Sequence, residues 1–129
     1  MIEHLSSQQM ERLLETLPFD ISFVDATDRL KYWNRHETRV FKRPHSALNI
    51  PVKQCHPQKS VDRVERIIED FKAGTRDTAE FWIDLKGMKL YIRYFPVRGE
   101  QGEYLGTLEV AQEITRIREL EGEKRLLDE

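Results

Sequence analysis

A thiol, an imidazole and the start of a predicted helix fall together at Cys55, His56 and Ser60. Ser60 is the expected N-cap of that helix, and the free backbone N–H groups at a helix start can bind a carboxylate or a phosphate. We therefore predict that these residues contact a small polar or anionic ligand. In the alternative, Cys55 fills core volume and His56 bonds a nearby carbonyl. This alternative is favoured because free cysteines are usually buried.

Three more candidate ligand-binding residues, Trp82, Arg93 and Glu109, lie on three different predicted strands. Arg93 and Glu109 could pair across a sheet or hold a polar ligand between them, and a surface ion pair is the alternative. Tryptophan belongs more often to a core than to a stacking surface, and we expect this of both Trp82 and Trp33.

No arrangement for catalysis or metal binding is recognisable in the sequence. It contains no nucleophile–base set, no glycine-rich phosphate loop and no kinase motif, so we expect no enzyme. The spacings of its cysteine and histidines match no zinc pattern, and we predict no metal site. The residues concerned are His4, His36, His45, Cys55 and His56.

The composition narrows the class of protein. Its 129 residues suit one domain, and 21 basic against 23 acidic residues give a net charge of −2. That balance provides no positive field for nucleic acid or for an anionic membrane. A single cysteine excludes an internal disulfide, no apolar run is long enough to span a bilayer, and no secretory signal is recognisable, so we expect a cytoplasmic protein.

Apolar spacing predicts two amphipathic helices in the first part of the chain. The first begins at a capping box of Ser6 and Gln9 and ends before Pro18. The second, over 60–71, carries one apolar face and is followed by Gly74. Strands are expected at 19–24, 30–34, 78–85, 89–97 and 104–111, with an irregular stretch over 35–59. This order predicts an α+β layer fold in which helices cover one face of an antiparallel sheet.

A third helix is expected over 114–128, because apolar residues recur there at heptad spacing, with Lys124 at one core position. The first helix likewise has an apolar stripe that needs covering. We therefore predict a homodimer through the N- and C-terminal helices. Glu113, Ile114 and Thr115 join the last strand to the terminal helix and are the predicted signalling residues.

Several segments, taken in order, resemble the PAS domain. These are the hairpin 23–34, the helix end 71–74, the strand 91–97, the turn 102–106 and the stretch 112–115, where Glu113 stands in place of the usual Asp. The likeness covers residues 19–118. The stretches 55–61, 79–83 and 120–127 are similar to the PAS domain that closes prokaryotic hemerythrin-linked proteins.

The resemblance implies a five-stranded sheet in the order 2-1-5-4-3, with a PAS domain over 19–115, a flanking helix over 1–18 and a signalling helix over 116–129. It also implies a sensory or interaction module that binds a small ligand or partner and relays this to a fused or separate output protein. A ligand-free dimerisation scaffold and a haem-binding redox or gas sensor are the alternatives. Haem is not favoured. Relatives that bind it carry a histidine on the long helix, and the helix expected here over 60–71 has none. Flavin is disfavoured, because the Arg-Phe-Leu-Gln that follows the reactive cysteine in light sensors is absent.

Overall fold

The computed structural model describes residues 1–54 and 58–128, with only the backbone at positions 58 and 59. Two α-helices are formed, α1 (Ser7–Thr16) and α2 (Gln58–Ala73). The strands are β1 (Asp20–Asp25), β2 (Leu30–Trp33), β3 (Ala79–Leu85), β4 (Met88–Arg98) and β5 (Tyr104–Glu113). Short 3₁₀ turns lie at Ile2–His4, His45–Ala47, Val52–Gln54 and Ile117–Glu119.

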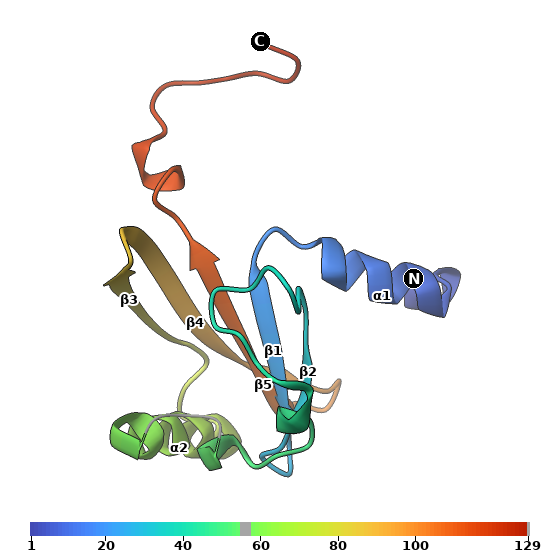
Figure 1. Cartoon of the computed structure of the whole chain (residues 1–129). Helices are drawn as coiled ribbons and strands as arrows, with labels where there is room; N and C mark the ends of the chain where they lie inside the picture. Colours follow the sequence, from blue (N-terminus) through green and yellow to red (C-terminus); the bar gives the residue numbers. More distant parts are fainter. Residues whose placement is uncertain (55–57, 129) are drawn as a thin grey trace.

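The strands form one antiparallel sheet in the order β2-β1-β5-β4-β3, which confirms the predicted α+β fold and strand order (Figure 1). The first and last strands of the chain pair at the centre, with Asp20 opposite Ala111 and Asp25 opposite Gly106. This places β5 between β1 and β4.

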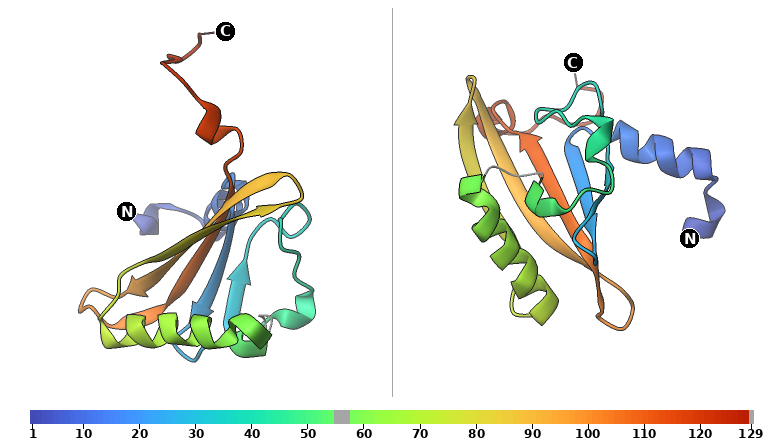
Figure 2. Two further views of the ribbon diagram at one scale, coloured as in Figure 1. Left: turned by 90° about the vertical axis from the view of Figure 1, so that its left-hand side faces the viewer. Right: turned by 60° about the horizontal axis from the view of Figure 1, so that its bottom comes forward.

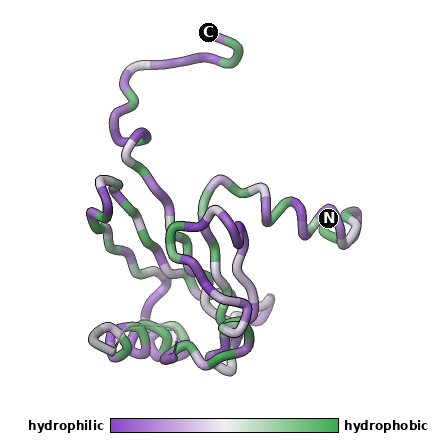
Figure 3. Tube along the Cα trace, in the orientation of Figure 1, coloured by the Kyte–Doolittle hydropathy of each residue, from purple (hydrophilic) through white to green (hydrophobic). Residues whose placement is uncertain are grey.

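Helix α2 lies across one face of the sheet, which we call the inner face (Figure 2). Hydrophobic and hydrophilic positions alternate along this helix, as its predicted apolar face requires (Figure 3). Ile68 is 5% exposed and Phe71 is fully buried. Phe71 packs with Ile92 and Ala111, so the helix is fixed against the two central strands β4 and β5.

Helix α1 begins at the predicted capping box, with Ser6 and Gln9 each bonding the other's backbone N–H. It extends away from the β2 edge of the sheet (Figure 1). Its last turn is held because Tyr32 Oη donates to Glu15 at 2.8 Å. Burial alone would raise the pKa of Glu15, but hydrogen bonds from Tyr32 and from the Arg35 backbone hold it below its ordinary value.

The chain after β5 is not the helix that the heptad spacing predicts. It forms one 3₁₀ turn and then continues away from the sheet to residue 128 (Figure 1). Leu120 is 67% and Leu127 85% exposed, so no described part of the single chain covers the apolar seam. A helix this short is marginal without a partner, and Gly122 adopts a left-handed conformation at φ +61° that interrupts it.

Candidate functional site

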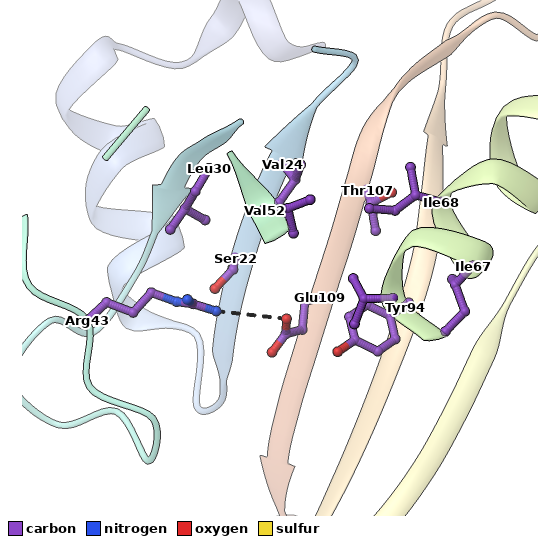
Figure 4. A pocket seen from close by; sticks show the side chains of 11 residues that line it. Ser22, Val24, Leu30, Arg43, Val52, Ile67, Ile68, Tyr94, Thr107 and Glu109 are labelled. Atoms are coloured by element: carbon purple, nitrogen blue, oxygen red, sulfur yellow. Dashed lines mark ion pairs between the residues drawn. The ribbon is translucent and has the colours of Figure 1, made fainter. Parts of the chain in front are cut away.

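A small cavity lies between the inner face of the sheet and α2, and we call it the inner pocket (Figure 4). Its apolar wall comes from β1, β2, the 3₁₀ turn Val52–Gln54 and α2. The residues of this wall are Val24, Leu30, Val52, Val64, Ile67 and Ile68. The polar lining residues come from the sheet and the irregular segment: Ser22, Arg43, Tyr94, Thr107 and Glu109.

The space inside this pocket is small. The volume open to the centre of a water-sized sphere is about 20 Å³, which is enough for about one water molecule. A larger guest would therefore need side chains of the wall to move. Six aliphatic residues make the wall, and side chains of this kind can change rotamer without leaving a polar group unpaired.

Arg43 reaches the pocket because the irregular segment is fixed to β1 by buried polar groups. Arg39, which is 4% exposed, donates to the carbonyls of Ile21, Asn34 and Phe41. Nearby, an Asp20 carboxylate oxygen accepts the N–H of Val40 at 2.8 Å. These bonds replace the regular secondary structure that the segment lacks, and they hold its next residues over the inner face.

Arg43 and Glu109 face each other at the polar end of the pocket (Figure 4). Their side chains are only 12% and 16% exposed, and the closest nitrogen and oxygen are 3.9 Å apart. That separation is an ion pair but too long for a hydrogen bond. Within the part of the chain that the structure describes, Arg43 Nε is buried and has no hydrogen-bond partner.

Two hydroxyls lie beside this pair. The Ser22 hydroxyl is engaged, because it accepts from Arg39 at 3.2 Å. Burial raises the pKa of Tyr94, and the neighbouring Glu109 carboxylate raises it further. Tyr94 therefore stays a neutral phenol at physiological pH and can offer its O–H as a donor.

A polar cleft opens beside the inner pocket, between the β1–β2 turn and α2. Lys72 Nζ bridges it by an ion pair to Asp28 at 2.8 Å. Val52 and Ile68 line both the cleft and the pocket. These two side chains therefore separate the pocket from the cleft.

The end of β5 is tied to the start of β4. Ile114 N donates to the carbonyl of Lys89 at 2.8 Å, and the Thr115 hydroxyl accepts from Lys89 N at 2.9 Å. The Thr115 N–H donates to the Glu113 carboxylate at 2.8 Å. The side chain of Thr115, and then its backbone N–H, hold the pKa of Glu113 below its ordinary value. The predicted junction residues thus form one bonded unit at the exit of the sheet.

A family model of the PAS domain matches residues 10–115, which is most of the chain. This chain belongs to the PAS domain family. Among curated proteins no sequence matches it. The narrower resemblance to hemerythrin-linked proteins stays a prediction.

Solved structures agree with this assignment. A C-terminal domain from Streptococcus mutans is 34% identical with a TM-score of 0.84, and the alignment covers 91% of both chains. A sensory box sensor histidine kinase from Vibrio cholerae has the same fold at 17% identity, TM-score 0.59, over 82% of this chain and 89% of that one. A VqmA–ligand–DNA complex from Vibrio cholerae is similar at 18% identity, TM-score 0.61, over 96% of this chain and 63% of that one.

Of the ligand-binding candidates that the sequence singled out, Glu109 lines the inner pocket. Arg93 and Trp82 lie on the opposite, outer face. Arg93 is paired with Val110 and Glu109 with Tyr94, and successive strand residues point to opposite faces. The predicted pairing of Arg93 with Glu109 is therefore wrong. Arg93 instead lies over the ring of Tyr91, with 4.8 Å from Cζ to the ring centroid.

The core position expected for Trp82 is also wrong, while that of Trp33 is confirmed. Trp82 is 62% exposed because β3 is an edge strand and its outward side has no covering layer. Trp33 is 2% exposed and belongs to the core with Leu30 and Ile68.

Cys55 and His56, the first residues singled out for chemistry, lie outside the described residues. Helix α2 begins at Gln58, so Ser60 is in its first turn and is not its N-cap. The Ser60 side chain is half-buried. Their predicted contact with a ligand stays a prediction.

Sequence reasoning missed Ser22, Arg43, Tyr94 and Thr107. The strand residues could have been found from alternation, because they share a face with buried positions of β1, β4 and β5. Arg43 had no such signal, since it follows an irregular segment without periodicity.

The described histidines His4, His36 and His45 do not line the inner pocket. His36 and His45 instead stack on each other, with ring centroids 5.3 Å apart. No cluster of three metal-ligating side chains occurs among residues 1–54 and 58–128. Over the same residues, no helix has the length and apolar character needed to cross a membrane.

Proposed function

We propose that this PAS domain is a sensory and interaction module in which occupancy of the inner pocket alters the exit of β5 and so the segment that follows. The observation that carries this proposal is that β5 is common to both places. It contributes Thr107 and Glu109 to the pocket, and it ends at the bonded junction of Glu113 to Thr115.

The paired strands β4 and β5 connect the pocket to the junction. Glu109 is opposite Tyr94 on β4, and Glu113 is opposite Leu90 on the same strand. A guest that displaces Glu109 acts on a β4–β5 ladder whose far end holds Ile114 and Thr115. Only a few kcal/mol of differential contact is needed to shift a two-state population.

We further propose that the output involves a second copy of the chain. Leu13 is 53% exposed on the apolar stripe of α1, which extends away from its own sheet. The outer face carries a half-buried row of Phe23, Leu108 and Phe95, which are directly opposite one another in the register. Two apolar surfaces that the described residues leave partly exposed favour association, and the exposed C-terminal seam could then form a paired helix.

The small volume of the pocket favours one alternative, a dimerisation scaffold that binds no ligand. A sensory module requires that the pocket and the junction are coupled, whereas a dimerisation scaffold does not. We expect Val64→Phe, which adds volume to the pocket wall, to change amide exchange of Ile114 and Thr115 by at least about threefold. Arg63→Phe, on the exposed side of the same helix, is the control. Equal exchange at the junction in both variants would leave only the scaffold.

Dimerisation is tested separately on α1. We expect the chain to sediment as a dimer at high micromolar concentration, and Leu13→Glu to make it a monomer, because a charge on the stripe cannot be desolvated. Gln8→Glu adds the same charge at an exposed position of the same helix and should leave the dimer intact. A wild-type monomer at high micromolar concentration would contradict the homodimer.

A further inference from the structure

We propose that the inner pocket selects a small, net-neutral molecule with an apolar body and one polar edge that carries a hydrogen-bond acceptor beside a donor, as a cyclic amide does. This inference rests on the proposed function, since it names the class of ligand that the pocket would hold. It is carried by the two charged side chains at the polar end of the pocket.

The acceptor is required by Arg43. Its guanidinium has five N–H donors in a planar fork. Nε is buried without a partner among the described residues, and the nearest Glu109 oxygen is 3.9 Å from the terminal nitrogen. A buried donor without a partner is costly. A carbonyl oxygen of a guest at this end of the cavity would accept a hydrogen bond from it and remove that cost.

The donor is required by Glu109. Its side chain is 16% exposed and faces the same end of the pocket, and its ion pair with Arg43 is too long, at 3.9 Å, to be a hydrogen bond. A carboxylate can only accept, so it pairs with an N–H or O–H of the guest. Arg43 and Glu109 are already neighbours, and the acceptor and donor of the guest must therefore also be neighbours on one edge.

The net charge of the guest follows from the same pair. One guanidinium and one carboxylate cancel, and little water screens them at this depth. The carboxylate of Glu109 would repel an anionic guest, and the guanidinium of Arg43 would repel a cationic one. We therefore favour a neutral guest over the anionic alternative that the helix start at Ser60 suggested.

The size and body of the guest follow from the wall. Six aliphatic side chains favour an apolar body. A volume of about 20 Å³ holds only about one water molecule, so even a guest with one small ring enters only if side chains of the wall move. Val52 and Ile68 separate the pocket from the polar cleft, so a guest that enters from the cleft must displace them.

Three probes of similar size separate the possible classes. δ-Valerolactam carries the donor and the acceptor, N-methyl-δ-valerolactam has only the acceptor, and valerate is an anion. We would titrate each into the full chain and follow the amide resonances of Thr107, Glu109 and Ile68 by NMR. The lactam should bind at least about tenfold more tightly than either of the others, which is the usual effect of one buried hydrogen bond.

Two conservative variants tie this preference to the pair. Arg43→Lys keeps the charge but removes the planar fork, and it should weaken lactam binding about tenfold. Glu109→Gln offers an amide donor as well as an acceptor, so the preference for the lactam over its N-methyl form should fall to within about threefold. Arg63→Met, on the exposed side of α2, should change neither.

Several results would overturn the inference. Equal or tighter binding of valerate, or equal binding of the two lactams, would show a different class of ligand while leaving the sensory function in place. Lactam binding that is unchanged by Arg43→Lys and Glu109→Gln would remove the assigned pair. If no probe perturbs the pocket resonances, the class is wrong, and the Val64→Phe exchange experiment still decides independently whether the pocket is coupled to the junction.

Discussion

Replacing Arg39 by methionine is expected to lower the free energy of unfolding by about 3–5 kcal/mol, the largest loss for any single polar side chain described above. Arg39 is 4% exposed, and its guanidinium donates to the carbonyls of Ile21, Asn34 and Phe41 and to the hydroxyl of Ser22. Methionine has a similar length but no donor. It would remove the donor to the carbonyls of Asn34 and Phe41, while the carbonyl of Ile21 keeps the N–H of Asn34. Each buried group that is left unpaired costs about 1–3 kcal/mol.

The effect should extend to the pocket, because the same bonds position the segment that leads to Arg43. The measurement is urea unfolding followed by tryptophan fluorescence, since Trp33 is buried in the adjacent core. Arg66→Met changes an exposed arginine of α2 in the same way and should shift stability by no more than about 0.5 kcal/mol. A loss in Arg39→Met that is no larger than in this control would contradict the role assigned to Arg39.

Replacing Phe71 by alanine is expected to cost about 3–5 kcal/mol through lost apolar burial and the cavity that remains. Phe71 is fully buried and packs with Ile92, Tyr94 and Ala111, so it connects α2 to the two central strands. Its carbonyl also accepts from Arg98 at 2.9 Å, which the substitution leaves in place. The loss therefore reports packing alone.

Phe81→Ala is the matched control. Phe81 faces the same side of the sheet and stacks on Tyr94 with ring centroids 6.2 Å apart, but it is 42% exposed on the edge strand β3. Its loss should cost only about 1 kcal/mol, because much of its surface is already in water. Equal destabilisation by the two alanine substitutions in calorimetry would mean that α2 is not fixed to the sheet by Phe71.

The elements of this PAS domain could be predicted from the sequence wherever the signal is local. Ser6 and Gln9 define the start of α1 because a capping box needs only residues three apart. The apolar face of α2 and the alternation along the strands are local in the same sense, since each depends on a fixed period. The observed start of α2, at Gln58, is two residues before the predicted start at Ser60, because helix ends depend on the preceding segment.

Side-chain partners across the sheet could not be predicted in this way. A shift of one residue in strand register reverses the face to which every side chain points. Reading Arg93 and Glu109 as partners needed a register that places both on one face, and the observed register places them on opposite faces. The exposure of Trp82 likewise depends on the position of β3 at the edge of the sheet, which is a property of strand order.

The five strands, the first two helices and, through the resemblance, the PAS fold could all be predicted without coordinates, because they depend on short-range periods and ordered motifs. Tertiary structure alone decided that Arg43 meets Glu109, since the two residues are distant in the chain and Arg43 comes from a segment without periodicity. It also decided the conformation after Thr115. A heptad pattern becomes a stable helix only when another surface buries its seam, and no part of the described single chain covers Leu120 or Leu127.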